Sequence, residues 1–318
     1  MQEVKSWLES LGYSDFSLKI ICTDASLRNY YRVIFEKKSF VVMDATKLKS
    51  SLLPFIDVAS KLLEVEVSVP QIIKEDTLNG YLLLEDFGDT LLANHLDENS
   101  FARLYTQALD EIIKIQKADT SSLELYDREF LIFEMNLMKD WLFDKYLSLE
   151  LSIAQEEILE KSLAFIADEV LSQPQGVMVH RDFHSRNLML VGEKIGVIDF
   201  QDAKVGAITY DLVSLLKDVY VYFEPQKIDE LALLFRDKKA LEVDDKTFIR
   251  WFDMMGLQRH IKILGIFARL HLRDGKSGYL KDLPLTYQYV LEAMTKYEEL
   301  SPLKRLFDEL DLKMRLIS

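Results

Sequence analysis

The sequence has little of what marks secreted, membrane or zinc-binding proteins. Cys22 is the only cysteine in 318 residues, so the chain can form no internal disulfide and has no cysteine cluster for zinc. No apolar run approaches the roughly 18 residues that a membrane span needs. Residues 1–13 lack the basic segment and apolar core of a signal peptide. We therefore expect a cytoplasmic protein.

Basic residues are also scarce relative to acidic ones. The sequence has 39 Lys and Arg against 53 Asp and Glu, a formal net charge of -14. This balance disfavours nucleic acid or an anionic membrane as the main partner, since both need a basic face. An anionic small molecule is still compatible with it, because such a ligand needs only a local basic pocket.

Glycine and proline are few as well, at 11 and 6, and we find no repeat or low-complexity linker. Apolar residues first occur in short β-rich segments, with Asn79-Gly80 and Glu36-Lys37-Lys38 as hairpin turns, and then follow helical spacing almost to the end. We expect strands at 18–22, 30–36, 39–44, 71–75 and 81–85, and helices at 2–11, 52–63, 98–117, 128–146, 154–172, 209–222, 226–236, 246–271 and 285–296.

The stretch from Val179 to Ala203, VHRDFHSRNLMLVGEKIGVIDFQDA, has the pattern of a kinase-type phosphoryl-transfer site. In H-R-D-x-x-x-x-N the aspartate accepts the proton of the attacking hydroxyl and the asparagine holds a metal ion. Asp182 and Asn187 occupy these positions, and Asp199 ends a strand twelve residues after Asn187. We expect Asp182 to be the base, with Asn187 and Asp199 binding Mg²⁺ through hard oxygen ligands.

The apolar runs 188–191 and 195–198 predict a hairpin that aims both metal ligands into one cleft. His180 is expected to support the loop through a hydrogen bond to the backbone, although catalysis by His180 or His184 stays an alternative. The predicted fold is therefore α+β, a two-lobed protein-kinase-like fold with a small β-rich lobe (1–86), a large mainly helical lobe (87–318) and ATP in the cleft between them.

The predicted nucleotide site departs from the kinase pattern. The loop 23–30 has no glycine, and the third strand has Met43 where kinases place a lysine that reaches the phosphates. Either another cation replaces that lysine or the site works without one. We expect Tyr81–Glu85 to be an edge strand leading into a hinge whose backbone pairs with adenine. The candidate nucleotide-binding residues are Thr23, Ala25, Ser26, Arg28, Arg32, Leu84 and Glu85, and the candidate replacement cations are Arg28, Arg32, Lys47 and Lys49.

The acceptor is expected to be a small molecule. Asp211 follows Asp199 by only twelve positions, and the long activation segment and A-P-E motif that protein kinases need are missing. A peptide-docking platform is therefore not expected. Asp211 itself is predicted to brace the catalytic loop.

HRDFHSRN, VIDFQDA and TYDL together resemble the aminoglycoside phosphotransferase and choline kinase branch of the kinase-like fold. Within that branch, TDASLRNYYRV, FVVMDA, LLLEDFG and MGLQRHIKILGIFARLHLRDGKSGYLKDLP resemble the bacterial anomeric N-acetylmuramate/N-acetylglucosamine kinases of cell-wall recycling, over residues 3 to about 296. The resemblance implies ATP-dependent phosphorylation of the C1 hydroxyl of an N-acetylated amino sugar. It also implies that the sugar 1-phosphate passes to a nucleotidyltransferase.

The helix 251–272 carries the candidate sugar-binding cations. Arg259 and Lys262, or Lys262 and Arg269, are spaced to share one helix face, and an arginine is the natural partner for the lactyl carboxylate of N-acetylmuramate. The alternative is a solvated basic face, or salt bridges to acids such as Asp253. The further candidates for sugar hydroxyls are Gln201 and Asp202.

Two other functions stay open at this point. An aminoglycoside-type antibiotic kinase would suit the acidic balance but not the basic residues of helix 251–272. A nucleotide-binding pseudokinase would suit the missing lysine and glycine-rich loop, but not the intact Asp182, Asn187 and Asp199.

Overall fold

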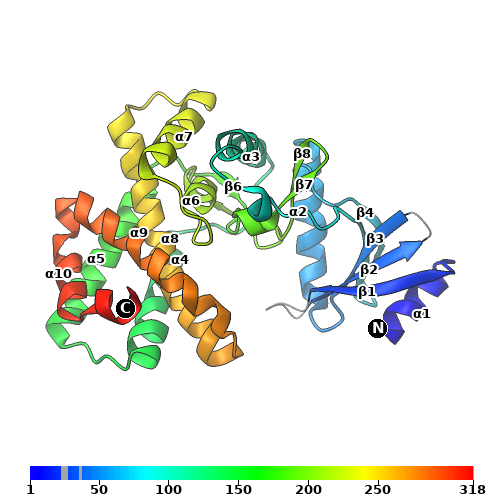
Figure 1. Ribbon diagram of the computed structural model, residues 1–318, viewed down its shortest axis with the longest axis horizontal. Helices are drawn as coiled ribbons and strands as arrows, with labels where there is room; N and C mark the ends of the chain where they lie inside the picture. The colour runs from blue at the N-terminus through cyan, green and yellow to red at the C-terminus, as the bar shows by residue number, and fades with distance from the viewer. Residues whose placement is uncertain (23–27, 36–37, 318) are drawn as a thin grey trace. The chain divides into compact units, whose positions relative to one another are not determined.

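The computed structural model describes residues 1–22, 28–35 and 38–317. The chain divides into two compact units. One, here called the β unit, comprises Met1–Leu96 and Arg186–Ala203; the other, the helical unit, comprises Asp97–Ser185 and Lys204–Ser318 (Figure 1). A small β-rich part and a large helical part are what the sequence pattern predicted. The lobe boundary at residue 86 stays a prediction.

One antiparallel five-stranded sheet, in the order β1-β2-β3-β5-β4, forms the centre of the β unit. All five predicted strands are present, with ends shifted by one or two residues or not at all, and the turn residues Glu36 and Lys37 lie outside the described residues. The strands are β1 (Phe16–Cys22), β2 (Asn29–Phe35), β3 (Lys38–Asp44), β4 (Ile72–Asp76) and β5 (Tyr81–Glu85).

The prediction that β5 is an edge strand was wrong. β5 pairs with β3 on one side and with β4 on the other, so β4 is the edge. Leu82, Leu83 and Leu84 are all buried. A continuous apolar run is typical of a strand that is covered on both faces, whereas a strand with one solvated face alternates.

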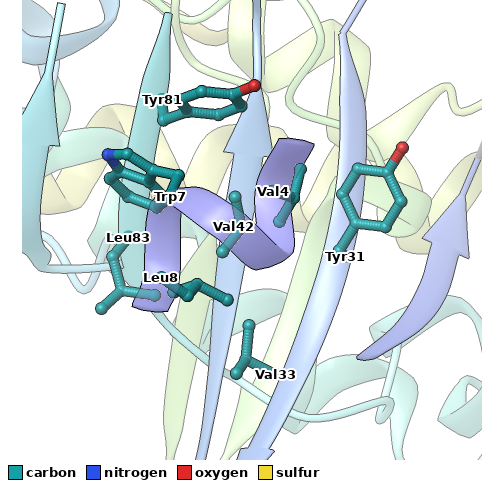
Figure 2. Packing of buried hydrophobic residues seen from close by; sticks show 8 residues of the cluster. All are labelled: Val4, Trp7, Leu8, Tyr31, Val33, Val42, Tyr81 and Leu83. Atoms are coloured by element: carbon teal, nitrogen blue, oxygen red, sulfur yellow. The ribbon is translucent and has the colours of Figure 1, made fainter. Parts of the chain in front are cut away.

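The predicted N-terminal helix is α1 (Gln2–Ser10), and it covers one face of the sheet. Val4, Trp7 and Leu8 follow helical spacing and project onto the sheet (Figure 2). The Trp7 ring stacks on Tyr81 at a centroid distance of 5.0 Å, and its Nε1 donates to Asp76 Oδ2 at 3.0 Å. The sheet residues under α1 are Tyr31, Val33, Val42, Tyr81 and Leu83.

Successive side chains of a strand point to opposite faces of the sheet. Met43 follows Val42, which faces α1, so Met43 points to the face away from α1. Met43 is fully buried and is paired in register with Tyr30 and Leu82.

The β unit also contains the predicted helix α2 (Leu52–Glu64). The predicted catalytic hairpin is present as β7 (Leu188–Val191) and β8 (Lys194–Val197).

The helical unit is organised around α8 (Asp245–Asp274), drawn in yellow to orange in Figure 1. Asp244 caps its first turn through Thr247 N at 3.0 Å, and Gly275 ends it in a left-handed conformation with φ 69°. α8 contacts α4, α5, α6, α7 and α9. The bounds are α3 (Phe101–Ile115), α4 (Arg128–Leu137), α5 (Ile153–Leu171), α6 (Tyr210–Leu216), α7 (Pro225–Lys238), α9 (Leu283–Lys296), α10 (Ser301–Glu309) and α11 (Leu312–Ile317).

Some predicted bounds of the helical unit were wrong. The helix expected at 209–222 ends at Leu216, because the chain then turns so that Asp218 can accept hydrogen bonds from Ser185. The helix expected at 128–146 is α-helical only to Leu137 and continues as the π-helix η3 (Met138–Tyr146). The sequence pattern did not predict α10, α11 or the short strands β6 (Val177–Val179) and β9 (Lys204–Gly206). Among the described residues, no helix has both the length and the apolar character needed to cross a membrane.

Candidate active site

The loop that carries Asp182 follows β6 in the helical unit. The carboxylate of Asp211, at the start of α6, accepts hydrogen bonds from the backbone amides of His180 (2.7 Å) and Arg181 (3.0 Å). Arg181 has a φ of 77°, a left-handed conformation that a non-glycine residue keeps only when its surroundings fix it. Asp211 therefore makes the bracing contacts expected of it.

Two further contacts set the shape of this loop. The amide of Asp182 donates to His180 Nδ1 at 3.2 Å, so the histidine ring supports the backbone as predicted. Ser185 closes the loop by donating its amide (3.0 Å) and hydroxyl (2.5 Å) to Asp218 Oδ2. Asp218 was not predicted from the sequence. As a result, the backbone on both sides of Asp182 is held by buried side chains.

The carboxylate of Asp182 lies in a positive field. Burial is the largest single effect and acts to raise its pKa, but the neighbouring positive charges, led by Arg259 and Lys262, together outweigh burial and lower the pKa to about 2. Arg259 Nη1 is 3.9 Å from Asp182 Oδ1. The Asp182 side chain is 49% exposed, so a ligand can reach it while it stays ionised at neutral pH.

The predicted metal ligands lie together in the β unit. Asn187 directly precedes β7, and Asp199 follows β8. The pairing of the two strands extends one step further, because the amide of Ile198 donates a hydrogen bond to the carbonyl oxygen of Asn187 at 3.1 Å. Asn187 Nδ2 is 3.5 Å from Asp199 Oδ2. Asp199 is exposed and has a φ of 65°, which turns its side chain at the end of the strand.

The surroundings of Asp199 fit a hard divalent cation. Gln201 Nε2 donates to Asp199 Oδ1 at 2.9 Å and to Asp202 Oδ2 at 3.0 Å, which brings two carboxylates and two amides together. Gln201 Oε1 is buried and has no hydrogen-bond partner among the described residues. Oxygen ligands of this kind are those that Mg²⁺ prefers.

Of the predicted nucleotide-binding residues, Thr23, Ala25 and Ser26 lie outside the described residues. The guanidinium of Arg32 is held by ion pairs with Asp86 (2.6 Å) and Asp89 (2.7 Å), and it also donates to Gly88 O (2.9 Å). Leu84 is buried within β5, and Glu85 N donates to Gln71 O at 2.8 Å.

Arg28 is a buried cation of the β unit. It is 7% exposed, and its Nε donates to Ser51 Oγ at 3.1 Å. Burial raises the pKa of Tyr30 to about 12; Arg28 opposes this rise, and Asp199 adds to it. The Tyr30 hydroxyl therefore lies within electrostatic reach of both Arg28 and Asp199, and Tyr30 itself pairs with Met43 across the sheet. By contrast, Lys47 and Lys49 are exposed, and Lys49 Nζ donates to Leu78 O.

The predicted sugar-binding cations of α8 do not form a solvated basic face. Arg259 and Lys262 are each 4% exposed, so that alternative was wrong for them. Asp253 does not pair with them either; it binds Lys217 (2.7 Å) and Lys296 (2.6 Å). Arg269 is partly exposed, and its Nε is buried without a hydrogen-bond partner among the described residues.

Glu134 on α4 is the functional candidate that sequence reasoning missed. It accepts from Arg181 Nη2 at 2.7 Å, pairs with Lys262 Nζ at 3.3 Å and also accepts from the hydroxyl of Tyr126. Lys262 Nζ in turn donates to the hydroxyl of Tyr210 at 2.7 Å. The signal was available, because Glu134 interrupts the apolar run FLIFEMNLM at a core-facing helix position.

A braced H-R-D loop and a hairpin carrying Asn187 and Asp199, on a sheet-plus-helices fold, define the class of kinase-like phosphotransferases. The phosphotransferase enzyme family profile matches residues 17–247, and the chain belongs to that family. The chain is 38% identical to the N-acetylmuramate/N-acetylglucosamine kinase of Neisseria meningitidis serogroup B, over 97% of this chain and 95% of the relative. It is also 38% identical to the kinase of that name from Pseudomonas aeruginosa, over 91% of this chain and 87% of the relative.

Solved structures confirm the predicted kinase-like fold. A choline kinase from Streptococcus pneumoniae matches with a TM-score of 0.64 at 13% identity, covering 93% of this chain and 99% of the other. An ADP-bound aminoglycoside phosphotransferase matches with a TM-score of 0.61 at 14% identity, covering 92% and 98%. At these identities the likeness establishes the fold alone.

Proposed function

We propose that this protein is an ATP-dependent kinase that transfers a phosphoryl group to the anomeric (C1) hydroxyl of N-acetylmuramate or N-acetylglucosamine. The observation that carries the proposal is the pairing of an intact catalytic loop with near full-length similarity to kinases that are named for these two sugars. The reaction is phosphoryl transfer to an alcohol, and its site of action is the cytoplasm, where ATP is available. A nucleotidyltransferase would consume the sugar 1-phosphate.

The residues of the chain take the following roles. Asp182 accepts a hydrogen bond from the sugar hydroxyl, orients it toward the phosphorus and takes its proton as the new bond forms. Asn187 and Asp199 would hold Mg²⁺, with Gln201 fixing the Asp199 carboxylate. The metal ion, when bound, neutralises charge on the ATP phosphates. Among the predicted sugar-binding residues, the Asp202 side chain is exposed and that of Arg269 is partly exposed, whereas the others are buried. Asp202 and Arg269 are therefore the proposed sugar contacts.

Arg28 is the proposed replacement for the strand lysine. It is buried, and its charge acts on the same Tyr30 hydroxyl as the charge of Asp199. A planar guanidinium suits phosphate oxygens. We expect Arg28→Met to raise the KM for Mg-ATP by about 10- to 100-fold. Lys49→Met, which removes an exposed cation from the same unit, should leave that KM unchanged; equal effects of the two changes would contradict the assignment.

The test of the proposed function is an acceptor panel. ADP release from Mg-ATP would be measured with N-acetylmuramate, N-acetylglucosamine, the 1-O-methyl glycoside of N-acetylglucosamine, choline and kanamycin. We expect turnover of one or both free sugars and none of the methyl glycoside, in which the C1 hydroxyl is blocked. Turnover of choline or kanamycin alone would overturn the proposal.

A further inference from the structure

We infer that Arg259 is a positioning residue that acts on Asp182 rather than on the substrate, and that the buried carboxylate of Glu134 anchors the loop on which both depend. The inference rests on the proposed function for the identity of the acceptor. It reassigns Arg259, whose sequence position suggested a sugar contact.

The geometry of Arg259 carries the first step. Its guanidinium donates to the carbonyl oxygen of Arg181 at 2.9 Å, and the same Nη1 lies 3.9 Å from Asp182 Oδ1. Arg259 is 4% exposed, whereas the Asp182 side chain is half exposed. A ligand can therefore reach the carboxylate, while the arginine is committed to the loop behind it.

Glu134 carries the second step. It is buried on α4 and binds the guanidinium of Arg181 on one side and the ammonium of Lys262 on the other. The Arg181 side chain is thus fixed by Glu134, its amide by Asp211 and its carbonyl by Arg259. These three contacts hold the left-handed backbone of Arg181, and that backbone sets the direction of Asp182.

The charges around Asp182 carry the third step. Arg259 and Lys262 face it from α8, and His180 and His184 face it from its own loop. Because these groups lower the pKa of Asp182, it is a weak base that holds and aims a hydroxyl but takes the proton only late in the transfer. Such a base suits an acceptor that is more acidic than an ordinary alcohol. A hemiacetal hydroxyl meets this condition, because the ring oxygen withdraws electrons from C1.

The test is the pH dependence of kcat between pH 4 and pH 8 with saturating sugar and Mg-ATP, for the wild type, Arg259→Met, Arg259→Lys and Arg250→Met. Arg250 is the matched control: it lies on the same helix and is partly buried in ion pairs with Glu169 and Glu299. Arg250→Met should lower stability but keep the wild-type pH profile.

We expect the ratio of kcat at pH 4 to kcat at pH 8 in Arg259→Met to fall to about half or less of the control ratio, because Asp182 returns to its ordinary pKa of about 4 or higher. Arg259→Lys should retain the wild-type ratio, and Glu134→Gln should lower kcat without moving the acid limb. A wild-type ratio in Arg259→Met would overturn the inference. If no sugar is turned over, the proposed function fails separately, and the acid limb is then read from hydrolysis of Mg-ATP by water.

Discussion

Gly265 in α8 offers a stringent test of the packing that positions Arg259 and Lys262. A Cβ added at Gly265 would lie 2.2 Å from the carbonyl carbon of Leu137, 2.3 Å from its oxygen and 2.4 Å from the amide nitrogen of Met138. These are backbone atoms, so no side chain can rotate away. The contact lies where α4 gives way to the π-helix η3. Gly265→Ala must therefore push two helices apart.

The expected magnitude follows from two opposed terms. Overpacking a rigid core costs about 1–3 kcal/mol and occasionally more, and we take roughly 3–4 kcal/mol because the obstacle is backbone on both sides of one peptide bond. Replacing glycine by alanine inside a helix returns about 1 kcal/mol. We thus expect Gly265→Ala to lower the free energy of unfolding by about 2–3 kcal/mol.

Gly256 is the matched control on the same helix. The atoms nearest to its added Cβ are Lys217 Cδ and Val213 Cγ1, both at the ordinary contact distance of 3.6 Å. Gly256→Ala should be neutral or more stable by up to about 1 kcal/mol. Urea unfolding followed by circular dichroism measures both variants. The reasoning is refuted if the two have equal stability, or if Gly265→Ala is the more stable one.

Three further changes test the loop, the ion cluster and a buried histidine. Asp182→Asn should lower kcat about a thousandfold with ATP binding retained, as measured by single-turnover kinetics and calorimetry; near-normal turnover would remove Asp182 as the base. Asp253→Asn should lower the free energy of unfolding by about 3 kcal/mol at pH 7, because it removes a buried carboxylate that pairs with Lys217 and with the half-exposed Lys296; a loss below 1 kcal/mol would contradict this. Burial lowers the pKa of His260 to about 3, so the folded state resists protonation that the unfolded state accepts below about pH 6.5. His260 should therefore cost about 2 kcal/mol of stability between pH 6.5 and pH 5, and His260→Gln should remove that part of the loss in urea titrations; an unchanged slope would refute it.

The sequence predicted the elements whose signals are local. The short apolar runs of β2 and β3, the three leucines of β5 and the helical spacing in α8 depend on neighbouring residues, so the positions of these elements could be predicted. The order of strands could not, since the place of β5 inside the sheet depends on pairing with both β3 and β4.

The candidate site was predictable where a motif fixes residue types at fixed spacings, as for Asp182, Asn187 and Asp199. Glu134 was missed because its partners Arg181 and Lys262 lie 47 and 128 positions further along the chain. The burial of Arg259 could not be predicted for a related reason: helix spacing shows which residues share a face, but not whether that face is buried. Only the packing of α8 against α4 and α6 decides this.

The most direct test of the central claim is the position of the new phosphate ester. Phosphorus NMR of the product from N-acetylglucosamine and Mg-ATP should show a phosphorus coupled to the anomeric proton, and acid should release the ester readily, as for a glycosyl phosphate. A phosphorus coupled instead to the two C6 protons, or no sugar phosphate at all, would contradict the account.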